Sequence, residues 1–167
     1  MKSMITIFTL MLGTLFSAQT LSVGKINVTM TNATGTGLFK EENDVKITYT
    51  PTDYFWKLEI ENKSDKTIEI DWDRSTFNYQ KKVSKIVFST TSKLLANQPK
   101  GKESIPKGMI LKKEIYPLEY ISFLPPTLSK SDIKKWGKTE YSINIAVIKD
   151  SSEFEIFGEF QAEMKVK

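Results

Sequence analysis

Residues 153–166 read EFEIFGEFQAEMKV, and this stretch decides the fold class of the chain. Apolar or small residues alternate with charged or polar ones, which is the two-residue period of a β-strand with one buried and one wet face. The buried face is predicted to carry Phe154, Ile156, Gly158, Phe160, Ala162, Met164 and Val166, and the wet face Glu153, Glu155, Glu159, Gln161, Glu163 and Lys165.

Two hairpins are predicted from such alternation. Residues 141–147 alternate as well, and only the polar residues 149–152 separate them from the C-terminal run, which indicates an antiparallel pair. Residues 54–60 and 68–72 alternate on either side of the polar turn 62–66, so they are predicted to pair in the same way. Trp56 and Trp72 are then expected to face one core.

The rest of the chain adds weaker expectations. A phase slip at Gly24 within residues 21–30 predicts a bulge, and Glu119 to Phe123 is a further strand candidate. Ser131 to Trp136 is the one short helix, with Ser131 as its cap. Thr90 to Gly108 is predicted to be a long loop with Leu94 and Leu95 as its apolar anchor. The other strand candidates are residues 45–50, 76–79, 83–88 and 109–116.

Many short strands predict an all-β chain, specifically an antiparallel, immunoglobulin-like β-sandwich of about seven to nine strands with at most one short helix. The competing fold is an eight-stranded outer-membrane barrel. Several strands are too short for the roughly 9–11 residues that a membrane-crossing strand requires, and the chain does not end on an aromatic residue. We therefore favour the sandwich.

The N-terminus predicts export. Lys2, an apolar run and a small residue at Ala18 match a cleavable signal peptide over residues 1–18, which would leave residues 19–167 as a single domain. No other apolar run is long enough to span a membrane. Cysteine is absent, so the domain has no disulfides, and we expect a bacterial, Gram-negative source and a place in the periplasm, on the cell surface or in the medium.

Histidine is absent too, which restricts catalysis. Ser-His-Asp and Cys-His mechanisms are excluded, as are zinc sites built on His and Cys, and no cofactor is expected. Ser131 and Lys134 have the Ser-x-x-Lys spacing of β-lactamases, but the further motifs of those enzymes are missing. Carboxylate-dependent glycan hydrolysis remains chemically possible.

Two weak binding sites are predicted. Asp71 and Asp73, with Asp65 across the turn, could bind calcium, although acids at a strand end most often face water. Trp136 with Lys134, Lys135 and Lys138 forms a basic aromatic patch for an anionic glycan or a lipid head group, unless the Trp only seats a loop. The net charge of +4 is spread along the chain, so nucleic-acid binding is not expected.

The stretch 58–73, LEIENKSDKTIEIDWD, resembles a hairpin of small exported bacterial β-sandwich proteins. Ile105-Pro106-Lys107-Gly108 is similar to their later loop into a strand. The resemblance implies a sandwich fold and an envelope location, and it brings no reaction or catalytic residue.

We therefore expect a non-enzymatic protein-interaction module of the cell envelope, acting through a free sheet edge or the Thr90 to Gly108 loop. The alternatives are a carbohydrate- or calcium-binding module and the carboxylate-dependent glycan hydrolase. The expected partner is an envelope protein or a glycan.

Overall fold

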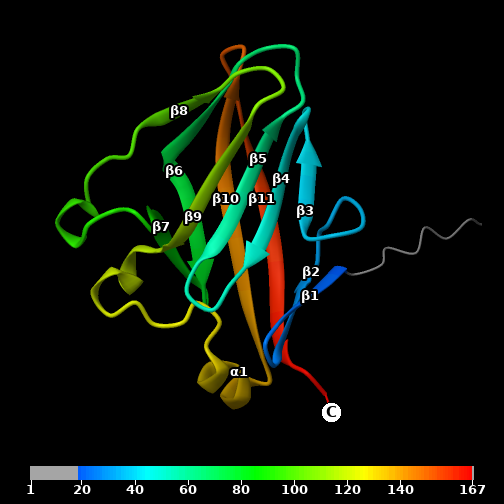
Figure 1. The fold of residues 1–167 in the computed structure, drawn as a ribbon, viewed down its shortest axis with the longest axis vertical. Helices are drawn as coiled ribbons and strands as arrows, with labels where there is room; N and C mark the ends of the chain where they lie inside the picture. The colour runs from blue at the N-terminus through cyan, green and yellow to red at the C-terminus, as the bar shows by residue number, and fades with distance from the viewer. Residues whose placement is uncertain (1–18, 167) are drawn as a thin grey trace, which may run out of the picture.

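A computed structural model describes residues 19–166, and the predicted signal peptide lies outside the described residues. Strands dominate, as predicted for an all-β antiparallel chain (Figure 1). The strands are β1 (Gln19–Val23), β2 (Ile26–Met30), β3 (Phe39–Glu42), β4 (Val45–Pro51), β5 (Trp56–Asn62), β6 (Ile68–Tyr79), β7 (Lys82–Phe88), β8 (Lys102–Ile105), β9 (Ile110–Pro117), β10 (Lys138–Lys149) and β11 (Ser152–Met164). The helical segments are η1 (Lys93–Leu95), η2 (Leu118–Ser122) and α1 (Lys130–Trp136).

One sheet contains every described strand, in the order β1-β2-β11-β10-β6-β7-β9-β5-β4-β3, with β8 beside β6. The sheet curls, so β5, β4 and β9 lie in front of β10 and β11, and the core fills the space between them (Figure 1). Strand β7 makes the corner, because its first half pairs with β6 and its last residues pair with β9. The described strands number eleven instead of about seven to nine, since the four-residue strands β3 and β8 carry no clear alternation.

The predicted C-terminal hairpin is confirmed. Strands β10 and β11 pair along their length, from Lys138 with Glu163 to Lys149 with Ser152. Gly158 faces the core as predicted, and a side chain there would meet the Tyr49 ring, whose Cζ lies 2.7 Å from the position of a Cβ. The glycine therefore lets the two halves of the sheet approach closely.

The second predicted hairpin is wrong. Strand β5 pairs with β4 and β9, whereas β6 pairs with β10, β7 and β8. The turn at residues 62–66 carries the chain from one half of the curled sheet to the other. Alternation and polar turn residues are common to a hairpin and a crossover, so the sequence pattern does not separate them. Trp56 and Trp72 nevertheless share one core, as predicted.

Three smaller predictions are also corrected. Gly24 has a φ of 57° and lies in the turn between β1 and β2, so the phase slip marks a hairpin and not a bulge. Residues 118–122 form η2 because Pro117 ends β9. Ser129, one residue before Lys130, caps α1 by accepting a hydrogen bond from the Asp132 backbone N–H, so Ser131 is not the cap.

No helix within residues 19–166 has the length and apolar character needed to cross a membrane.

Candidate functional site

The acidic residues singled out in the sequence lie where β6 is interrupted. The pairing of β6 with β10 shifts between Asp71 and Thr76, leaving a bulge. Asp71 Oδ1 accepts hydrogen bonds from the backbone N–H groups of Asp73 and Arg74, at 3.2 and 3.3 Å. Ser75 Oγ donates to the Asp71 carbonyl and accepts from the Ala146 N–H. These side chains close the bulge by satisfying backbone groups that the ladder leaves unpaired.

Asp73 points away from the bulge and holds a distant segment. Its two carboxylate oxygens accept the backbone N–H groups of Lys100 and Gly101, at 2.8 and 2.9 Å. The hydrogen bond from Lys100, joined by that from Gly101, lowers the pKa of Asp73 below its usual value of 3.8. The Asp71-Trp72-Asp73 stretch therefore acts as a clamp on the end of the loop that precedes β8.

The neighbouring Trp72 secures the next residues. Its ring is buried and packs edge-on against Phe88, with the ring centroids 5.0 Å apart. Its indole N–H donates to Glu103 Oε2 at 3.1 Å, and Lys113 reaches the same carboxylate oxygen at 2.8 Å. Strand β8 is thereby tied to both β6 and β9 by side chains as well as by its ladder with β6.

The predicted Thr90 to Gly108 loop thus contains η1 and β8. The segment between β7 and β8, residues 89–101, is here named the leucine loop. Ala96 is its buried anchor, packed with Val87 and Tyr116 in a small second core. Lys100 Nζ donates to the Ala96 carbonyl at 3.1 Å. The loop is consequently held at its centre and at its end, although it has no long regular element.

Leu94 and Leu95 are not the anchor that the sequence suggested. They lie on η1 and are 91% and 59% exposed. Figure 1 shows η1 projecting from one side of the molecule, beyond β7 and beside η2. Exposed leucines side by side on a fixed loop are an unusual use of apolar surface, typical of a contact region. Sequence alone could not identify Leu94 and Leu95 as exposed. Leucine is more hydrophobic than alanine, so the two leucines and not Ala96 were the expected buried residues.

The chain segment that contains the leucine loop is basic in sequence. Residues 74–102 contain one arginine and six lysines, and no aspartate or glutamate. Lys85 and Lys93 are exposed, whereas burial lowers the pKa of Lys100 from its usual value, with Asp73 acting in the opposite direction. The exposed leucines are therefore accompanied by lysines, while the acidic side chains that contact the loop, Asp73 and Glu114, are hydrogen-bonded to it.

The structure does not assemble the predicted calcium site. The Asp71 and Asp73 carboxylates accept backbone hydrogen bonds from different segments of the chain, and Asp65 lies exposed in the crossover turn. Among residues 19–166, no three carboxylate side chains are grouped so that they could hold a metal ion.

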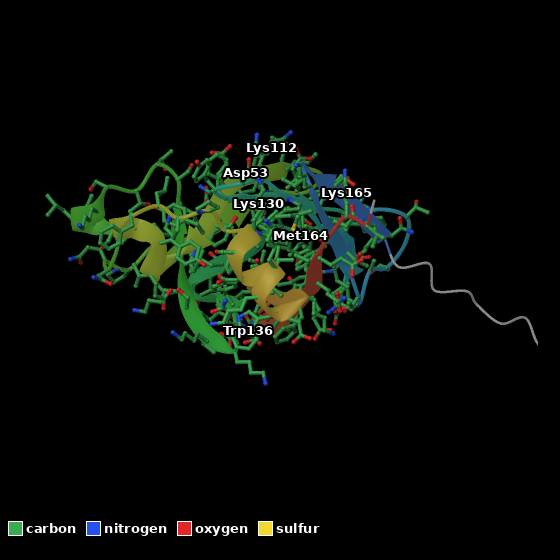
Figure 2. All side chains as sticks on the ribbon, turned by 90° about the horizontal axis from the view of Figure 1, so that it is seen from below. Asp53, Lys112, Lys130, Trp136, Met164 and Lys165 are labelled. Carbon is green, nitrogen blue, oxygen red and sulfur yellow. The ribbon has the colours of Figure 1, made fainter. Side chains whose placement is uncertain are left out.

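The predicted basic aromatic patch stays together at the end of α1. Trp136 is 64% exposed, with the Lys135 ammonium 4.7 Å from the centre of its ring, and Lys134 is exposed in the same helical turn. Lys138 begins β10 and donates to Gln161 Oε1 at 3.2 Å. Figure 2 shows Trp136 on the opposite side of the molecule from Lys112 of β9.

Comparison with protein-family models, curated proteins and solved structures finds no significant match to the chain.

Proposed function

We propose that the chain is an exported, non-enzymatic protein-interaction module of the cell envelope and that the leucine loop is its contact surface. The observation that carries the proposal is the exposure of Leu94 and Leu95 on a loop clamped by Asp73 and Ala96. The immunoglobulin-like sandwich is proposed as its fold family, supported by the antiparallel pairing and the buried tryptophans. Export is supported by the sequence pattern of residues 1–18 alone.

Energetics favour a protein contact at this position. Burying a leucine side chain in a partner's pocket contributes about 1.5–3 kcal/mol, so two adjacent leucines form a credible anchor. Because the clamp already holds the loop, little conformational entropy is lost when it docks. A floppy loop with the same residues would bind less tightly.

The charge of the region specifies the partner's chemistry. Lys85 of β7 and Lys93 of η1 are exposed on and beside the leucine loop, and they would attract a surface rich in aspartate and glutamate. We therefore propose an acidic protein surface with an apolar pocket, so the association should be fast at low ionic strength and weaken as salt is added.

The test is site-specific crosslinking in cells. A photoreactive amino acid is placed at position 95 of a C-terminally tagged chain, and crosslinked peptides are identified by mass spectrometry, which also identifies the mature N-terminus. The expected result is a crosslink to an acidic surface of one envelope protein, in yield that falls in high salt and in a Leu94→Asp variant. Gln19 is the expected first residue of the mature chain.

A matched control is Met109→Asp just before β9, where the methionine is 57% exposed and lies outside the leucine loop. Crosslinking should survive this substitution. The proposal is contradicted if the leucine loop crosslinks only to lipid, if no partner is captured, or if Leu94→Asp and Met109→Asp behave alike.

A further inference from the structure

The outer face of β6, β10 and β11 carries a groove of about 410 Å³, and no residue of the leucine loop lines it. Its wall is formed by Asn78 of β6, Glu140 and Ser142 of β10, and Glu159 and Gln161 of β11, with Thr31 at one rim. These polar residues occupy the solvent-facing positions of the three strands, and the rings of Tyr79, Tyr141 and Phe160 line the rest of the groove. Its volume lies within the range of small-molecule sites.

The wall mixes hydrogen-bond donors and acceptors. It combines two amides, two hydroxyls and two carboxylates, and Lys81 adds one ammonium group. Sugar hydroxyls both donate and accept hydrogen bonds, so they match such a wall better than a ligand that only accepts. Phosphate binding would require a cluster of cations, which this groove lacks.

One wall residue is left incompletely hydrogen-bonded. Asn78 Nδ2 donates to Ser142 Oγ at 2.9 Å, while Asn78 Oδ1 is buried without a partner among the described residues. Exchanging the two amide atoms would let Oδ1 accept from Ser142, but Nδ2 would then lack that partner. In either orientation, a polar atom at the groove is available to a ligand that shifts the side chain slightly, and an unpaired buried group favours such a ligand.

The charges of the groove nearly cancel. Glu140 and Glu159 are opposed by Lys81 of the lining and by Lys138, whose ammonium lies 3.6 Å from Glu140 Oε1. The same lysine donates to Gln161. A neutral polar ligand would therefore meet no large electrostatic penalty, whereas an anion would meet two carboxylates.

An exposed aromatic ring is close in sequence to Lys138, which contacts Glu140 and Gln161 of the groove. Trp136 precedes Lys138 by two residues, and Figure 2 places it on the side of the molecule away from Lys112. Aromatic rings supply large contact areas at binding sites, and the exposed Trp136 ring could stack on the apolar face of a sugar ring. The basic aromatic patch would then be the rim of the groove and not an anion site of its own.

We infer that this groove binds a neutral saccharide, with Gln161 supplying hydrogen bonds and Trp136 a stacking surface. The experiment titrates the ¹⁵N-labelled domain, residues 19–167, with chitotetraose, cellotetraose and maltotetraose, and with inorganic phosphate as a charged probe. At least one neutral sugar should shift the amide signals of Ser142 and Gln161. The variants Gln161→Ala and Trp136→Ala should each weaken that binding by about tenfold.

Two matched controls carry the same kind of substitution elsewhere. Gln98→Ala removes an exposed glutamine of the leucine loop, and Phe123→Ala removes an exposed aromatic after η2. Both should bind the sugar like the unaltered domain. The inference is overturned if none of the sugars binds at about 10 mM, where a site with a Kd near 1 mM would be mostly filled. Binding of phosphate alone, or equal loss in the control variants, would overturn it as well.

Discussion

Two turns of nearly the same composition do different things in this molecule. Residues 149–152 join β10 to β11 in a tight hairpin, in which Asp150 and Ser151 have φ angles of 51° and 64°. Residues 62–66 carry the chain from β5 across to β6 in the opposite half of the curled sheet. Both are polar, with Lys, Ser and Asp, and both follow alternating strands. The difference between them cannot arise from turn propensity.

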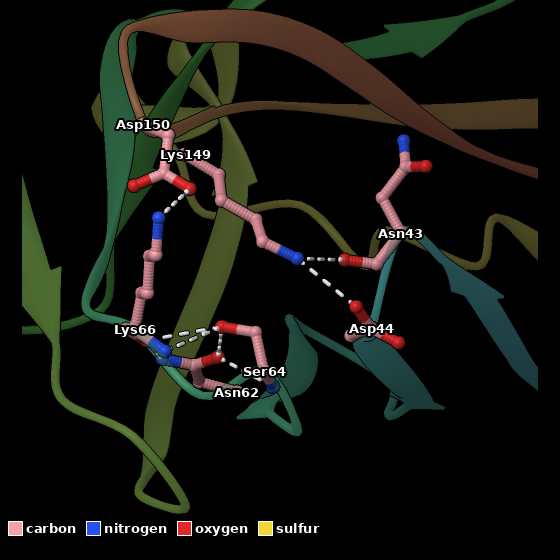
Figure 3. Close-up of polar contacts among 7 residues, drawn as sticks. All are labelled: Asn43, Asp44, Asn62, Ser64, Lys66, Lys149 and Asp150. Carbon is pink, nitrogen blue, oxygen red and sulfur yellow. Dashed lines mark hydrogen bonds and ion pairs between the residues drawn. The ribbon is translucent and has the colours of Figure 1, made fainter.

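The difference arises from one buried side chain, Asn62. Its amide Nδ2 donates to the carbonyls of Lys66 and Ile105, at 2.7 and 2.8 Å. Its Oδ1 accepts from the backbone N–H and the hydroxyl of Ser64, at 3.0 and 2.6 Å. Figure 3 shows Asn62, Ser64 and Lys66 closing the crossover turn on themselves. The crossover is thus fixed by a fully buried amide, whereas the hairpin needs only its backbone ladder.

The comparison predicts that Asn62→Asp in the crossover turn destabilises the domain far more than Asp150→Asn in the hairpin turn. Asn62→Asp should destabilise the domain by about 3–5 kcal/mol. The substitution places a buried carboxylate next to the two carbonyl oxygens that the amide now donates to, and a carboxylate cannot donate to them. Burial should raise the pKa of the introduced carboxyl, so the loss is largest above that raised pKa and partly recovered as pH falls through it. Urea unfolding as a function of pH measures both.

Asn62→Ser provides a smaller polar control, which leaves partners unpaired without adding charge. It should lose stability independently of pH. A pH-independent loss for Asn62→Asp as well, or no loss, would show that the amide is not what holds the crossover.

The regular hairpin can be broken at one position, Gly158. Gly158→Ala should cost about 1–3 kcal/mol, because the new Cβ would overlap the rings of Tyr49 and Phe160, whose nearest atoms lie at 2.7 and 2.8 Å. Thermal unfolding measures the loss. In Gly158→Ala combined with Tyr49→Val, the two losses should be less than additive because the second change makes room. Full additivity would show that the loss of stability in Gly158→Ala does not come from overlap with the Tyr49 ring.

Sequence reasoning succeeded where a single physical rule dominates. Period-two alternation identified β10, β11 and their turn, and it placed Trp56 and Trp72 in the core. It failed at Asn62, because a buried amide that bonds to Ile105 is a long-range contact with no local signature. Strand β8 was missed for the same reason: it is too short to alternate, and it is held by its ladder to β6 and by Trp72.

The binding candidates were predictable to different degrees. Trp136 between lysines and a glycine was expected to be exposed, and it is. The groove at Asn78, Ser142 and Gln161 was not predicted, because β6, which is far away in sequence, meets the C-terminal hairpin there. Asp73 looked like a metal ligand, since a carboxylate that accepts backbone N–H groups has the same sequence signature as one that faces an ion.

Breaking the clamp of the leucine loop should have a moderate, local effect. Asp73→Ala removes two exposed hydrogen bonds and should cost about 1 kcal/mol. Amide hydrogen exchange at Lys100 and Gly101 should accelerate more than exchange in β11. The pKa of Asp73 is lower in the folded than in the unfolded chain, so the ionised carboxylate stabilises the fold. This stabilisation is fully present above the ordinary pKa of 3.8 and is lost as the pH falls through the lowered pKa. An Asp65→Ala control should leave the loop unchanged, and equal exchange rates in the two variants would argue against the clamp.

The two turns touch each other, and the smallest effect should come from cutting that contact. Lys66 of the crossover lies 2.7 Å from Asp150 of the hairpin, with both side chains about half exposed (Figure 3). The hydrogen bond that Lys66 donates to Asp150 raises the pKa of Lys66, yet solvent screens the pair. Asp150→Asn keeps a residue that tolerates the left-handed backbone and removes only the charge. Its melting temperature should change by no more than about two degrees, and less in high salt. A drop comparable to that of Asn62→Asp would mean that the hairpin, too, depends on a tertiary contact, and the distinction between the two turns would disappear.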